Sequence, residues 1–303
     1  MRVHLHNHGI LLILALIVVA ASLGVPGFFN ADNIANVVRQ SSVLVLLALG
    51  QTFVVVAGMI DLSVGSLVSL VVVLAASNAG SEVLSIALGV GLASGLVIGL
   101  LVNFLKINSL VLTLGMMTII NGMVFVYTEQ SIGAPAPWLV SLANGNIAGI
   151  PAVLPLVVAV AGVCHGLLQH TRFGLHLQAT GGSDENARHA GIRTNRIIVL
   201  SFIANGLLAG VAGLILLGRI GTGYPNAGSG LELDAIVAVV LGGTSLRGGR
   251  GSMITSALAA VVLSLVSNIL NLLEISAFVQ MTAKGLIVLS VVLLNQPPKR
   301  AFA

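Results

Sequence analysis

One carboxylate, Asp61, lies between two long apolar runs, in a segment that reads AGMIDLSVGS at 57–66. A carboxylate at membrane depth is costly and normally faces the protein interior or water, so Asp61 is a candidate for a transport pathway. It is also a candidate for capping the helix that follows, because Asp and Ser accept hydrogen bonds from the free N–H groups at a helix start. The residue types leave both roles open.

Neutral polar side chains inside the apolar runs form a second set of candidates. A hydroxyl-rich ligand needs neutral donors and acceptors rather than charges, so these side chains are candidates for a sugar pathway. Hydrogen bonding between helices is the alternative role for any single one of them. The set comprises Gln51, Ser63, Asn103, Thr113, Asn121, Asn205, Asn268 and Asn271.

A third candidate is the polar loop 170–196. Within it, Ser183 is a suitable N-cap, acidic residues follow it, and a basic pair precedes Gly191. This order is typical of a short helix. Such an exposed helix between two membrane spans would dock into a groove of a cytoplasmic partner; a solvated loop without a partner is the alternative.

Several kinds of chemistry are missing from the sequence. The glycine-rich stretch GGTSLRGGR at 242–250 lacks the lysine and the strand-to-helix setting of a phosphate-binding loop, so we do not expect ATP hydrolysis. The sequence contains no Ser/His/Asp constellation that would indicate an enzyme and no paired Cys/His spacing that would indicate a metal site. Cys164 is the single cysteine, so it has no partner for a disulfide within the chain. The histidines at 4, 6 and 8 could bind a metal in principle, but they are interpreted as part of an unstructured terminal tail.

The composition decides the class of protein. Of the 303 residues 57% are hydrophobic and 7% are charged, and the mean hydropathy is +1.09. A soluble domain is roughly 25% charged, so this chain lacks the polar surface to face water. A membrane helix needs about 20 apolar residues, and the sequence divides into about ten such segments. We therefore predict an all-α polytopic membrane protein with one domain, 1–303.

The expected spans fill nearly the whole chain, and segment 58–66 is the main ambiguity, being either a cytoplasmic turn or a helix break at membrane depth. The spans are 10–25, 34–57, 62–78, 83–105, 108–128, 151–169, 196–219, 233–246, 251–273 and 276–295. Small residues recur at every fourth position at Gly91, Gly95 and Gly99, and again at Gly206 and Gly210, which predicts close helix packing.

Basic residues indicate the orientation. They lie near the N-terminus, in the loop and near the C-terminus, which makes the tail 1–9, the loop 170–195 and both termini cytoplasmic. The loop 129–150 contains no Lys or Arg and is expected to be periplasmic. The net charge of +4 is scattered over helix ends, so it does not indicate nucleic acid.

Four stretches together resemble the permease subunits of ribose-type sugar ABC importers, a family with ribose, xylose, arabinose, galactose and autoinducer transporters. They are segment 58–66, the run TLGMM at 113–117, the stretch 225–236 and the stretch 242–252. The likeness extends from about residue 30 to residue 294. Met59 replaces one glycine of the family signature.

The resemblance also implies a role for the loop, because segment 179–192 is similar to the coupling-helix region that docks on the ATPase. Ser183 stands where Asn is usual, and Asn186 where a small residue is usual. The residues so identified are Gly181, Gly182, Ser183, Asp184, Glu185, Asn186, Ala187, Arg188, Gly191 and Ile192.

The resemblance implies a half-transporter in the bacterial inner membrane, surrounded by lipid. Two permease chains would form one pathway above an ATPase with tandem ATP-binding domains, which would hold ATP and Mg²⁺, while this chain would hold no cofactor. A periplasmic binding protein would deliver a monosaccharide. A branched-chain amino acid permease is the near alternative, and a secondary transporter or a membrane enzyme are the alternatives from other classes.

Overall fold

The computed structural model describes residues 2–78, 80, 82–276, 279, 280, 282, 285 and 286. In this part of the chain it contains twelve helices and one two-stranded antiparallel hairpin. These elements are α1 (Arg2–Gly24), α2 (Ala31–Val56), α3 (Val64–Ala76), α4 (Val83–Leu105), α5 (Ser109–Tyr127), α6 (Pro137–Asn144), β1 (Asn146–Ile147), β2 (Ile150–Pro151), α7 (Val153–His170), α8 (Arg172–Gly182), α9 (Asp184–His189), α10 (Thr194–Ile220), α11 (Leu231–Leu241) and α12 (Met253–Leu272).

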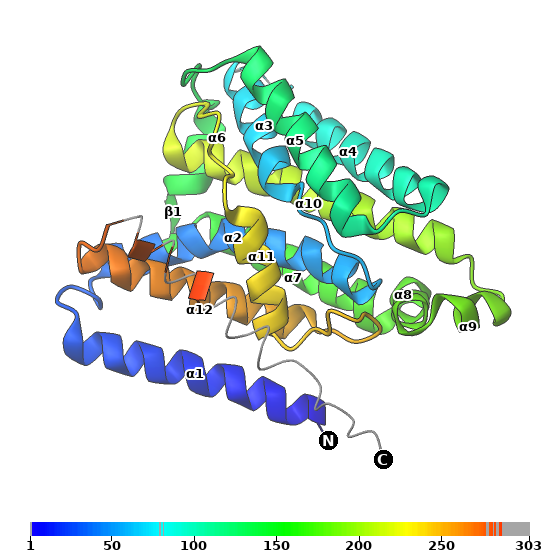
Figure 1. Cartoon of the computed structure of the whole chain (residues 1–303). Helices are drawn as coiled ribbons and strands as arrows, with labels where there is room; N and C mark the ends of the chain where they lie inside the picture. Colours follow the sequence, from blue (N-terminus) through cyan, green and yellow to red (C-terminus); the bar gives the residue numbers. More distant parts are fainter. Residues whose placement is uncertain are drawn as a thin grey trace.

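The helices give the molecule two ends (Figure 1). One end, called here the α9 end, contains the N-terminus and segments 171–193 and 242–252. The opposite end, called the β1 end, contains the hairpin and segment 128–145, and there Ile132 forms a bridge with Gly223. Six described helices are long and apolar enough to cross a membrane: α2, α4, α5, α7, α10 and α12.

Helices α2 and α10 form the centre of the molecule. Helix α10 contacts α2, α3 and α4, and α2 also contacts α7, α11 and α12. Most of α2 is buried, whereas α5 and α7 leave most of their length exposed. Their exposed side chains are large and apolar, as Val126 and Val163 illustrate. A surface of this kind suits contact with lipid rather than with water.

The predicted glycine packing is confirmed between α4 and α10. A Cβ atom at Gly91 or at Gly206 would collide with the backbone of the other glycine, and a Cβ at Gly99 would lie 2.9 Å from the Val199 Cα. A Cβ at Gly210 would lie 2.5 Å from the Ala87 carbonyl oxygen. Helix backbones approach this closely only where side chains are absent, which is how helices pack in lipid.

Several expected boundaries are wrong. The expected spans 62–78 and 233–246 are shorter in the structure: α3 has 13 residues and α11 has 11. At about 1.5 Å per residue each is too short for a hydrocarbon core of about 30 Å. The chain reaches α3 through a non-helical break at 57–63 and reaches α11 through the turns of 221–230.

Other differences concern the ends of the chain and the loop. Helix α1 begins at Arg2, so the expected tail is helical rather than unstructured. The loop 129–150 contains α6 and most of the hairpin. The side chains of the three histidines near the N-terminus, and most of the expected span 276–295, lie outside the described residues.

Candidate functional site

Helix α2 ends in a glycine turn that starts the break. Gly58 has φ +81°, a conformation that glycine adopts at little cost. The Met59 N–H donates to the Val54 carbonyl (3.0 Å), which is the six-to-one bond of a Schellman motif. The backbone then stays non-helical until α3 begins at Val64.

Hydroxyl groups of α5 satisfy backbone groups of the break. The Ile60 N–H donates to Ser109 Oγ (3.0 Å), and the Leu62 N–H donates to Thr113 Oγ1 (3.1 Å). The Thr113 hydroxyl also lies 3.4 Å from the Ile60 carbonyl oxygen. Buried non-helical backbone needs hydrogen-bond partners for its polar groups, so these contacts explain how α5 supports the break.

Gln51 of α2 pairs with the backbone of Asp61. With its amide oriented to satisfy both groups, its oxygen accepts from the Asp61 N–H (3.1 Å) and its NH₂ donates to the Asp61 carbonyl (3.3 Å). Gln51 is fully buried. This two-point contact fixes the position of Asp61 relative to α2.

The Asp61 carboxyl group is buried and has contacts on both oxygens. Oδ1 accepts from the Ser63 N–H (2.8 Å) and from Ser63 Oγ (2.6 Å), while Oδ2 accepts from Asn205 Nδ2 of α10 (2.9 Å). Asp61 therefore forms a turn with Ser63, the residue before α3, whereas the predicted cap on an N–H group of α3 itself is not seen. It also joins the break to α10, a contact that no pattern in the sequence indicated.

Asn205 reaches Asp61 beside a glycine of α2. A Cβ atom at Gly50 would lie 2.5 Å from Asn205 Oδ1 and 3.1 Å from the Asn205 Cα. Asn205 Oδ1 is buried and has no hydrogen-bond partner among the described residues. A buried amide oxygen without a partner is a place where a polar ligand or water gains a bond.

The predicted short helix in the loop is confirmed as α9, at the α9 end beside α8 (Figure 1). Ser183 Oγ accepts from the Asn186 N–H (3.3 Å), which is the predicted N-cap. Arg188 Nε donates to Asp184 Oδ2 (2.9 Å), and Arg188 Nη2 donates to Asn195 Oδ1 in the first turn of α10 (2.7 Å). Arg188 therefore ties α9 to α10.

The remaining predicted loop residues surround this contact. Gly181 and Gly182 end α8, and Glu185 is exposed on α9, whereas Ala187 is buried beneath it. Gly191 has φ +81° and turns the chain towards α10. Directly after this turn, the Ile192 N–H donates to the Ala187 carbonyl (3.0 Å).

The surroundings of Asp184 on α9 shift the pKa of its carboxyl group. Partial burial acts to raise its pKa, but polar contacts with Thr194 and Arg188 and the charge of Arg188 outweigh burial, so the pKa of Asp184 lies below its ordinary value. The carboxylate therefore stays charged, and its ion pair with Arg188 is intact at neutral pH.

Three glycine-containing segments meet where α2 ends. The Gly249 N–H donates to the Val56 carbonyl (2.8 Å). A Cβ at Gly248 would lie 2.6 Å from the Gly181 carbonyl oxygen and 2.7 Å from the Gly58 Cα. The stretch 242–250 is thus part of the contact between the break and the end of α8, a role that its glycines alone did not predict.

Comparison with known proteins identifies the family. The model of a family described as "Branched-chain amino acid transport system / permease component" matches residues 33–294. This chain belongs to that permease family. Ribose import permease protein RbsC of Haemophilus influenzae is 37% identical over 292 residues, covering 92% of this chain and 90% of that protein.

Other relatives of this permease are also named as sugar transport permeases. RbsC of Escherichia coli is 36% identical over 301 residues, covering 96% of this chain and 94% of that protein. The L-arabinose transport system permease protein AraH of Escherichia coli is 35% identical over 301 residues, covering 97% of this chain and 92% of that protein. No solved structure gives a significant match. The permease is a multi-pass inner membrane protein, and its relatives are transport components rather than enzymes.

A cavity of about 550 Å³ lies between α9 and the break of the permease. Met59 lines it from the break, Lys106 lines it from the end of α4, and Asp184, Arg188 and Asn195 line it from α9 and α10. The cavity places the loop and the break on opposite sides of one space at the α9 end.

Two predicted pathway residues lie away from Asp61. Asn103 of α4 donates to the Asn195 carbonyl (3.2 Å) near the start of α10. Asn268 of α12 exchanges hydrogen bonds with Asn33 of α2 (2.8 and 3.1 Å). Both side chains make the contacts between helices that were their alternative role.

The two other predicted pathway residues, Asn271 and Asn121, are at least partly exposed. Asn271 near the end of α12 is exposed and accepts from Gln280 (2.8 Å). Asn121 lies on α5 and is partly exposed. The structure therefore gathers only part of the predicted set around the break. The gathered residues are Gln51, Asp61, Ser63, Thr113, Asn205 and Ser109. Ser109 was not predicted, because a serine at the start of an apolar run is typical of an ordinary helix start.

Proposed function

We propose that this permease is the membrane subunit of an ATP-driven importer that moves a ribose-type monosaccharide into the cell. The observation that carries the proposal is the polar break at Asp61, joined through α10 to the exposed helix α9. The names of the relatives, ribose import permease and L-arabinose transport system permease, support a pentose or a similar sugar.

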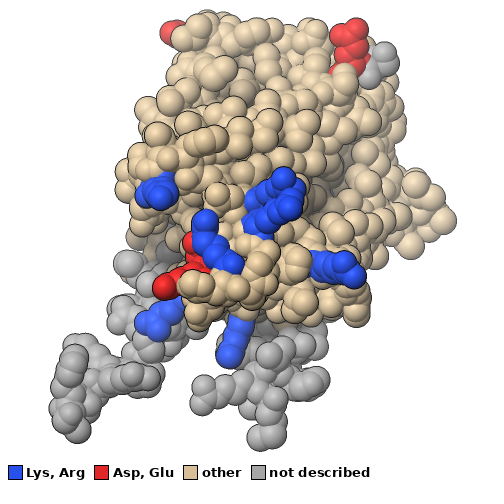
Figure 2. All heavy atoms as spheres, turned by 90° about the vertical axis from the view of Figure 1, so that its right-hand side faces the viewer, with Lys and Arg blue, Asp and Glu red and all other residues tan. Residues whose placement is uncertain are grey.

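The topology that fits this function has about ten membrane helices. These are α1, α2, α4, α5, α7, α10 and α12, the shorter α3 and α11, and the expected last span 276–295. Helices α3 and α11 are too short to cross alone, so each would cross together with the non-helical segment that leads into it. An even number of crossings puts both termini on one side. Lys and Arg gather at the α9 end (Figure 2), which supports a cytoplasmic location of this end. Those at this end are Lys106, Arg172, Arg188, Arg193, Arg196, Arg247 and Arg250.

Two arginines lie towards the other end and find amide partners. Arg39 donates to Asn146 Oδ1 (2.8 Å) in the hairpin, and Arg219 donates to Asn36 Oδ1 (3.2 Å). The two cations count mildly against a periplasmic β1 end, and each has an amide partner there.

Helix α9 is the proposed contact with the ATPase. Its exposed Glu185 and the Asp184–Arg188 pair present both charge signs to a partner. Importers of this kind work with an ATPase and a substrate-binding protein. The ATPase would have tandem ATP-binding domains and would bind ATP and Mg²⁺. This chain would bind no cofactor. A second permease chain completes the pathway.

The proposed coupling runs along α10. A displacement of α9 reaches Asn195 through Arg188 and moves α10 as a rigid element. Asn205 lies further along the same helix and holds the Asp61 carboxyl group. The break would thus rearrange when the ATPase closes, because ATP binds the closed state more tightly and shifts the population towards it.

The experiment that tests the function is reconstitution with the genomic neighbours. We expect a bound ATPase whose turnover rises with a sugar-loaded binding protein, and uptake of a pentose but not of leucine. Leucine uptake would favour the amino acid alternative. Transport by the purified chain alone, driven by an ion gradient, would refute the ATP-driven mechanism.

A variant pair tests the α9 contact. Glu185→Ala with Arg188→Ala should uncouple ATP hydrolysis from uptake while membrane insertion stays normal. Arg172→Ala is the control, since this exposed arginine lies on the same end, outside α9. Normal coupling in the double variant would place the ATPase contact elsewhere.

A further inference from the structure

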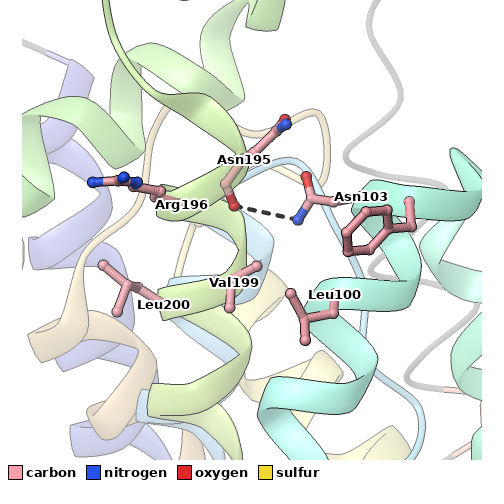
Figure 3. A pocket seen from close by; sticks show the side chains of 7 residues that line it. Leu100, Asn103, Asn195, Arg196, Val199 and Leu200 are labelled. Atoms are coloured by element: carbon pink, nitrogen blue, oxygen red, sulfur yellow. Dashed lines mark hydrogen bonds between the residues drawn. The ribbon is translucent and has the colours of Figure 1, made fainter.

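A groove lies between α4 and α10 at the α9 end, with a volume of about 420 Å³ (Figure 3). Leu100 and Phe104 of α4 form one wall, and Val199 and Leu200 of α10 form the other. Phe104 is 80% exposed, so the groove opens to the surroundings of the protein rather than into its core. Its apolar walls are suited to an alkyl chain.

The end of the groove nearest the loop is polar and positive. Asn103, Asn195 and Arg196 line it (Figure 3). The neighbouring cavity shares the two asparagines and adds Lys106 at the end of α4, together with the Asp184–Arg188 ion pair. Within the described part of the chain, neither Arg196 nor Lys106 makes an ion pair, whereas Arg188 is paired with Asp184. Two uncompensated cations therefore lie beside one end of an apolar groove.

We propose that this groove binds an anionic phospholipid of the cytoplasmic leaflet. The phosphate lies at the polar end of the groove beside Asn103 and Asn195, with Arg196 on the groove side and Lys106 on the side of the neighbouring cavity, and one acyl chain lies against the apolar walls. The charge pattern supports this occupant, because basic pockets between membrane helices on the cytoplasmic side bind acidic head groups. The inference rests on the proposed cytoplasmic location of the α9 end.

The lipid would act on a contact next to α9. Asn103 donates to the Asn195 carbonyl across the floor of the groove, and the Asn195 side chain accepts from Arg188. A phospholipid that joins the end of α4 to the start of α10 would hold these residues together. We therefore expect anionic lipid to favour the arrangement in which α9 is tied to α10.

Native mass spectrometry of the delipidated full-length permease provides the test. Phosphatidylglycerol and phosphatidylcholine with the same acyl chains are titrated against the protein in detergent. We expect tighter binding of phosphatidylglycerol. Lys106→Gln with Arg196→Gln should weaken phosphatidylglycerol binding about thirtyfold and leave phosphatidylcholine unchanged, since each basic residue contributes about a factor of five near an acidic head group.

Two further variants separate charge from shape. Arg172→Gln removes a cation from the same end but outside the groove, so its lipid binding should equal that of the unmodified chain. Val199→Trp fills the groove without changing charge and should weaken phosphatidylglycerol binding. Normal folding of each variant is checked by circular dichroism.

Several outcomes would overturn the proposal. They are equal affinity for the two lipids, unchanged binding in the Lys106 and Arg196 double variant, or full competition by glycerol phosphate, which would indicate a site for a free phosphate. Burial of a label at Leu200→Cys in a lipid-free dimer would assign the groove to a second permease chain. Lipid binding is measured without transport, so failure of the proposed import function would leave this result unaffected.

Discussion

Gln51→Leu is expected to destabilise the break between α2 and α3. The Gln51 amide satisfies the buried N–H and carbonyl groups of Asp61, at 3.1 and 3.3 Å. Leu has similar volume and offers no polar atom, so both backbone groups would lose their partner. The substitution therefore isolates the polar contact from packing.

The magnitude follows from these two groups. An unsatisfied buried polar group costs about 1–3 kcal/mol, which gives about 2–6 kcal/mol for the pair. Contacts inside membrane proteins average nearer 0.6 kcal/mol, because the unfolded chain in a membrane also finds partners. We therefore expect a loss of about 2 kcal/mol in the free energy of unfolding, at the low end of the first range.

Unfolding by sodium dodecyl sulfate in mixed micelles measures this loss, and Thr52→Val is the matched control. Thr52 is fully buried next to Gln51, but its hydroxyl donates within α2, to the Ala48 carbonyl (2.6 Å). The control should cost less than 1 kcal/mol. If Gln51→Leu costs no more than the control, the two-point contact with Asp61 does not support the break.

Further substitutions test other contacts. Asp61→Asn should retain most of the stability, because Asn205 can turn its unpartnered Oδ1 towards the new amide. Asp61→Ala leaves three donors unsatisfied and should lower the free energy of unfolding by about 3 kcal/mol or more. Sugar uptake by both variants tests whether transport needs the carboxylate. Gly206→Val should separate α4 from α10 and reduce folded protein in size-exclusion chromatography, and a normal yield would contradict the close packing. Asn268→Leu should cost about 1 kcal/mol and a second change, Asn33→Leu, should recover part of it, which a double-mutant cycle checks.

The fold class could be predicted from composition alone. With 7% charged residues the chain has no alternative to a membrane environment, and in lipid a single chain of this composition forms helices. The spacing of Gly91, Gly95 and Gly99 predicted a packing face correctly, because small residues on one helix face have a local signature. The short helix α9 was also predictable, since its cap at Ser183 and its charge order are local.

The lengths of α3 and α11 were predicted less well. Hydropathy assigns one full span to each apolar run, so α3 and α11 were expected to be longer than they are. The apolar residues around them do not reveal where a helix stops, because in lipid-like surroundings the stop depends on whether other elements satisfy the freed backbone groups.

The sequence by itself therefore determined the membrane class, the positions of most spans, the short helix α9 and the candidate residue Asp61. The tertiary structure decided which polar side chains meet it: Gln51 from α2 and Asn205 from α10, while Asn268 pairs with Asn33 elsewhere. The physical reason is that a buried polar group takes its partner from whatever helix lies nearest in space, and a one-dimensional pattern of apolar runs does not encode that proximity.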